Sequence, residues 1–154
     1  MPTIEDVYWK FGFVSEAAQL LETELGTLLF RSGAIEAGLF ESPDHDKAWE
    51  LLQLVNRKTL GQLIRSLGST DYSVDDLEEL MTKALRERNR LTHSFYRQHN
   101  YRRNSEDGCA VMLEDLESIH ETILDAYKAV MKLSGVDIET MTSEEPPTEH
   151  VPIV

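Results

Sequence analysis

The segment LEELMTKALRERNRLTHSF, from Leu77 to Phe95, decides the fold class because its apolar residues recur at helical spacing. On a helical wheel of about 100° per residue, these residues fall within an arc of about 140°. A helix with this pattern packs one face in a core and exposes the other to water. The members of the arc are Leu77, Leu80, Met81, Ala84, Leu85, Leu91 and Phe95.

Helical spacing continues on both sides of this segment, and no stretch shows the sustained alternation of a strand. The helix that contains the arc is expected to begin near Val74, with Ser73 and Asp76 as a capping box, and to run into the high nineties. After a loop over residues 100–108, a further helix is expected to end before Gly135, because glycine is common just beyond helix ends.

The first half of the chain predicts two long helices and a short apolar stripe before them. Gly12 is expected to interrupt the stripe, and Ser15 is expected to cap the first long helix. Asp46 is expected to cap the second long helix, which ends at Gly68. The sequence therefore predicts an all-α fold, an up-and-down bundle of four main helices with or without an extra N-terminal helix.

The chain length of 154 residues suits one domain with a single core. The C-terminal stretch VDIETMTSEEPPTEHVPIV holds five acids and three prolines but no lysine or arginine, which is typical of disorder. We therefore expect a helical bundle domain over residues 1–135 and an acidic disordered tail over residues 136–154.

Composition excludes several classes of protein. Cys109 is the single cysteine, which excludes an internal disulfide and a zinc site built from cysteines. No apolar run reaches the roughly 18 residues of a membrane helix, and the N-terminus MPTIEDVYWK lacks the order of a secretory signal. Glycine-rich phosphate-binding loops are also missing. We expect a cytoplasmic protein that needs no cofactor and does not bind a membrane.

Positive charge is concentrated in one part of an otherwise acidic chain. The formal net charge is −13, whereas residues 86–103 hold six arginines and a single acid, Glu87, a balance of +5. The planar guanidinium group of arginine can bind a phosphate through two hydrogen bonds, and tyrosine rings stack on bases. The residues expected to bind RNA are Arg86, Arg90, Tyr96, Arg97, Tyr101, Arg102 and Arg103.

Arg88 falls inside the apolar arc, where an unpaired buried charge costs several kcal/mol. Three interpretations remain open: the guanidinium reaches past its neighbours to water, it pairs with an acid of the bundle such as Glu114 or Glu117, or it lines a cleft or a subunit interface and binds an anion there. Asn89 and His93 are four residues apart, so they stack on one side of the helix beside the arc.

The run Arg88-Asn89-Arg90-Leu91-Thr92-His93 resembles the R-x4–6-H motif of the HEPN superfamily, with a polar residue directly after the arginine. RNRLTHSFY is similar to the signature near the end of that family's third helix. TLGQLI, from Thr59 to Ile64, resembles uncharacterised bacterial members. The similarity covers about residues 48–132.

The resemblance implies a metal-independent endoribonuclease whose site forms where two subunits of a homodimer meet. His93 would act in acid–base catalysis as the 2′-hydroxyl attacks the adjacent phosphate, Arg88 would hold the phosphate charge, and Asn89 would orient His93 or the phosphate. Such a protein fits a toxin or defence component controlled by an antitoxin or another regulatory protein. The alternative is a non-catalytic HEPN-like helical module that binds RNA, a nucleotide or a protein partner.

A second group of residues has the spacing of a metal site. Glu117-Ser118-Ile119-His120 is an E-x-x-H sequence, which di-iron bundles use twice, and this chain has one copy. His120 also lies on the apolar stripe of its helix, with Leu116 and Ile123. We therefore expect a core histidine with a hydrogen-bond partner and no metal site.

Overall fold

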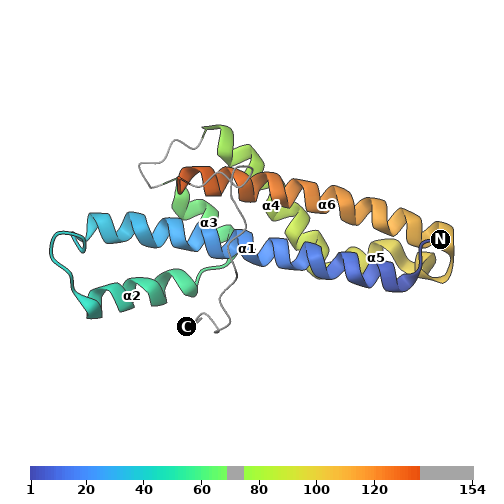
Figure 1. Ribbon diagram of the computed structural model, residues 1–154, viewed down its shortest axis with the longest axis horizontal. Helices are drawn as coiled ribbons and strands as arrows, with labels where there is room; N and C mark the ends of the chain where they lie inside the picture. Colours follow the sequence, from blue (N-terminus) through green and yellow to red (C-terminus); the bar gives the residue numbers. More distant parts are fainter. Residues whose placement is uncertain (69–74, 136–154) are drawn as a thin grey trace, which may run out of the picture.

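The computed structural model describes residues 1–68 and 75–135, and these ranges contain six α-helices, one 3-10 helix and no strand (Figure 1). The prediction of an all-α helical bundle is confirmed. The predicted tail and the predicted cap at Ser73 lie outside the described residues. The elements are α1 (Ile4–Glu36), α2 (His45–Asn56), α3 (Leu60–Leu67), α4 (Asp75–His93), α5 (Phe95–His99), the 3-10 helix η1 (Asn100–Asn104) and α6 (Glu106–Leu133).

Helix α1 is one continuous helix of 33 residues, so the predicted break at Gly12 and the predicted cap at Ser15 are wrong. Its cap is Thr3, whose hydroxyl accepts the Asp6 amide at 3.3 Å while the Asp6 carboxylate accepts the Thr3 amide at 2.8 Å. A glycine in a helix interior costs only about 1 kcal/mol. Burial of the stripe along α1 outweighs that cost, and this stripe contains Val7, Val14, Leu21, Leu25 and Leu28.

The predicted second long helix is two helices. Helix α2 begins after the cap Asp44 rather than Asp46, and it ends at Asn56. Thr59 then caps α3 in a capping box, in which the Gln62 side chain accepts the Thr59 amide at 2.8 Å. The new cap starts a new direction, so α2 lies along the second half of α1 while α3 packs against α1 and α4 (Figure 1).

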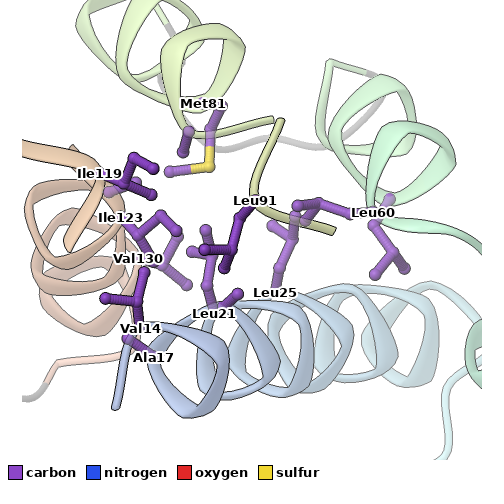
Figure 2. Close-up of a cluster of buried hydrophobic side chains, with 14 of the residues drawn as sticks. Val14, Ala17, Leu21, Leu25, Leu60, Met81, Leu91, Ile119, Ile123 and Val130 are labelled. Carbon is purple, nitrogen blue, oxygen red and sulfur yellow. The ribbon is translucent and has the colours of Figure 1, made fainter. Parts of the chain in front are cut away.

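Helices α1, α4 and α6 form the main body of the molecule. Glu22 pairs with Arg88, and Tyr8 contacts Tyr96, so α4 and α5 run antiparallel to α1. The apolar stripes of the three helices meet in one core, which α3 extends (Figure 2). All seven members of the predicted arc on α4 and α5 are buried or half-buried, which confirms the predicted core face.

The segment between the end of α4 and the start of α6 contains more regular secondary structure than predicted. Ser94 separates α4 from α5, and η1 occupies half of the loop expected over residues 100–108. Ser105 caps α6 by accepting the Gly108 amide at 3.1 Å. A Cβ atom at Gly108 would lie 1.9 Å from the carbonyl oxygen of Arg102, so only glycine lets η1 pack this closely on α6.

Candidate nucleic-acid interface

Four polar residues follow one another along the exposed side of α4 and α5. Arg86, Asn89 and His93 are spaced by three or four residues on α4, which makes them neighbours on its surface, and Arg97 follows on α5. All four are exposed, and none is acidic. Arg97 Nη2 donates to the His93 carbonyl oxygen at 3.1 Å, which ties the end of α4 to α5. We call these four residues the outward row.

Arg88 lies beside the outward row but points toward α1. One Nη lies 2.8 Å from Glu22 Oε1, the other donates to Asn89 Oδ1 at 3.1 Å, and 26% of the Arg88 side chain is exposed. Of the three interpretations of Arg88, the structure supports the ion pair with an acid. That acid is Glu22 rather than Glu114 or Glu117. The pair brings a half-buried positive group to the edge of the outward row.

Arg90, which the sequence assigned to RNA binding, lies in an ion-pair network between α4 and α6. Its Nη1 and Nη2 donate to the two Asp115 oxygens at 2.7 and 2.6 Å, and Nη2 also donates to Glu87 at 2.8 Å. The hydrogen bonds between them raise the pKa of Arg90 and lower the pKa of Asp115. A guanidinium engaged by two carboxylates has no free fork for a phosphate, so this arrangement suits a structural role for Arg90.

His99 is the one buried polar residue in the part of the chain that the structure describes, with 4% of its surface exposed. Its Nε2 lies 2.6 Å from Asp115 Oδ2, and its Nδ1 lies 2.9 Å from Arg102 Nη1. The ring also packs on Phe95, with ring centres 4.5 Å apart. His99 could not be predicted as a site residue from the sequence, because its partner Asp115 belongs to another helix and no motif connects the two.

Aromatic and basic side chains also meet where α5 and η1 pass the start of α1. Arg103 Nη2 donates to the Tyr8 hydroxyl at 2.7 Å, and its guanidinium carbon lies 5.9 Å from the centre of the Tyr8 ring. Tyr96 packs against Tyr8 and Phe11, and burial raises the pKa of Tyr96. Tyr101 is 79% exposed. Tyr8 therefore contacts two of the predicted RNA-binding residues, Arg103 and Tyr96. These contacts could not be predicted from the sequence.

Glu117 and His120, the E-x-x-H pair on α6, both contact Lys10. Lys10 contacts the Glu117 carboxylate and donates to His120 Nδ1 at 3.1 Å, so its ammonium group lies between the two side chains. Burial lowers the pKa of His120, and the nearby Lys10 charge lowers it further. His120 is half-buried and has the predicted hydrogen-bond partner. Over residues 1–68 and 75–135, no three ligand-type side chains gather as a metal site requires.

Comparisons with protein-family models, with curated proteins and with solved structures found no match to this chain. Among the described residues, no helix combines the length and the apolar character of a membrane span.

Proposed function

We propose that the protein is a metal-independent endoribonuclease of the HEPN type. The observation that carries this proposal is the placement of His93, which is exposed in the last turn of α4, one turn from Asn89 and near Arg88. Its ring has no hydrogen bond among the described residues, so it is accessible for proton transfer with a ribose hydroxyl. The two arginines of the outward row add the positive surface that an RNA backbone requires.

In the proposed reaction, His93 takes the proton of a 2′-hydroxyl as that oxygen attacks the adjacent phosphorus. Arg88 stabilises the charge that develops on the phosphate oxygens, and Asn89, bonded to Arg88, orients the guanidinium. The bond from phosphorus to the 5′-oxygen breaks, and the 5′-oxygen takes a proton from the protonated His93 of the second subunit. The products are a 2′,3′-cyclic phosphate and a 5′-hydroxyl.

We predict a homodimer, because one chain supplies one His93 and the reaction uses both a base and an acid. The apolar arc does not supply the contact between the subunits, because Leu91 and Phe95 are only 3% and 1% exposed and pack within the chain. Light scattering at micromolar concentration should give twice the chain mass of 17.6 kDa. A monomer whose mass does not change with concentration would contradict the shared site.

Cleavage itself is tested with the purified protein and an end-labelled single-stranded RNA. We expect products that end in a 2′,3′-cyclic phosphate, identified by mass spectrometry, and the same rate with and without EDTA. A DNA strand of the same sequence is the control, since it lacks the 2′-hydroxyl and should stay intact. Products with a free 3′-hydroxyl, or cleavage that EDTA stops, would contradict the mechanism.

One observation favours the alternative, a non-catalytic HEPN-like module that binds RNA, a nucleotide or a protein partner. Glu22 already holds Arg88, so a phosphate must compete with a carboxylate for that guanidinium. RNA binding that weakens steeply with salt, without cleavage of any RNA, would favour the module. With either function we propose a cytoplasmic protein; as a ribonuclease we propose a toxin or defence component restrained by an antitoxin or another regulatory protein.

A further inference from the structure

A chain of polar contacts runs from Arg90 through Asp115 and His99 to Arg102, and His99 is its buried member. Asp115 is fixed from one side by both Nη atoms of Arg90, at 2.6 and 2.7 Å. From the other side it meets His99 Nε2 at 2.6 Å. The chain of contacts ends at the molecular surface, because Arg102 is exposed whereas His99 is buried.

The partners of His99 define which ring nitrogen carries the proton. Arginine has donors only, so Nδ1 must accept from Arg102 and is therefore unprotonated. Nε2 then carries the hydrogen and donates it to the Asp115 carboxylate. Asp115, Arg102 and the Phe95 ring contact the imidazole from α6, η1 and α5, so both its orientation and its tautomer are fixed.

Arg102 itself is held at two places. Its backbone packs on Gly108, and its Nη1 is bound to His99, while its remaining donors have no carboxylate within ion-pair distance in the described part of the chain. Arg88 and Arg90 differ in this respect, because both already pair with acids. Arg102 is thus an exposed cation whose direction is set by a buried imidazole.

We propose that His99 is a positioning residue of the RNA surface: together with Asp115 it holds the Arg102 guanidinium ready for a phosphate of the RNA backbone. This inference rests on the proposed RNA-directed function of the same surface. A side chain that is already ordered loses less conformational entropy when RNA binds, so the hold contributes to affinity although His99 never touches RNA. Arg102 contacts the phosphate, and His99 acts only through Arg102.

The experiment is a double-mutant cycle on the affinity of the full chain for a short single-stranded oligouridylate. His99→Leu should weaken binding about fivefold, the effect of freeing one long side chain. His99→Gln should bind like the unmodified protein, since an amide can donate to Asp115 and accept from Arg102. In an Arg102→Ala background, His99→Leu should cause no further loss. Asp115 keeps Arg90 in every variant, so the helices stay joined.

Full additivity of the two substitutions would overturn the positioning role, because His99 would then act independently of Arg102. A failure of the unmodified protein to bind RNA is a different result and would overturn the proposed function first. A measurement on the unmodified protein covers the case in which His99→Leu does not fold: guanidinium rotation by nuclear magnetic resonance. Arg102 should rotate more slowly than exposed Arg86, and equal rates would contradict the hold.

Discussion

Replacement of His93 by alanine should abolish RNA cleavage while the helix content and the dimer stay unchanged. General acid–base catalysis contributes about a hundred- to ten-thousand-fold, and one substitution removes it from both subunits. The His93 ring is exposed and has no side-chain hydrogen bond among the described residues, so the fold does not depend on it. Initial rates on labelled RNA, with circular dichroism as the check on folding, measure the effect.

The chain offers a matched control in His45, an exposed histidine at the start of α2. His45→Ala should leave the cleavage rate unchanged. Arg88→Ala should also abolish cleavage, but it leaves the half-buried Glu22 carboxylate without its partner and should lower stability too. Arg88→Lys keeps a positive charge near Glu22 and removes the fork, so it separates the two effects. Cleavage that survives His93→Ala would mean that another site or a contaminant is responsible.

Periodicity predicted the core face of α4 correctly, because a helix with an apolar arc can bury it in only one way. Met81, Ala84 and Leu91, which are among the most buried residues, are all in that arc. The helix boundaries were less predictable. Gly12 was overruled by the long buried stripe of α1, whereas Thr59 ended a helix that apolar spacing alone would continue. Boundaries depend on local caps, which compete with periodicity.

The candidate site could be predicted only as far as one helix reaches. Spacing within α4 predicts that Arg88 falls inside the apolar arc and that Asn89 and His93 lie beside it. The partners of Arg90 do not, because Asp115 is 25 residues away on α6 and the rotation of α6 decides which side chain faces α4. A pattern within one helix cannot identify an acid on the opposite helix.

Arginines that are close together in the sequence therefore have different partners in the structure. In the sequence they form one basic patch, but the structure separates its members by their partners: Arg88 pairs with Glu22, Arg90 with Asp115 and Glu87, Arg102 with His99, Arg103 with Tyr8, and Arg97 with the His93 carbonyl. Three of these partners, Glu22, Asp115 and Glu87, are carboxylate groups that oppose the arginine charge. The cations that remain for the proposed RNA surface are Arg86, Arg97, Arg102 and Arg103.

Asp115→Asn should lower the free energy of unfolding by about 3 kcal/mol at neutral pH, because it breaks a largely buried ion pair and leaves Arg90 and His99 facing an amide. The amide can accept from one of them, but its NH2 group then meets a donor. Urea unfolding followed by circular dichroism measures the loss. Glu114→Gln is the matched control, since it removes the same charge from an exposed neighbouring position and should change stability little.

The same carboxylate should make stability depend on pH. The hydrogen bond from Arg90 lowers the pKa of Asp115 below its ordinary value of 3.8, so the folded state binds a proton there less readily than the unfolded state. The stabilisation by Asp115 is therefore complete above about pH 4 and falls as the pH drops through the lowered value. The stability difference between the unmodified protein and Asp115→Asn should accordingly shrink below pH 4. A difference that stayed constant down to pH 2 would mean that the loss comes from packing, because only a titrating carboxylate gives this acid dependence.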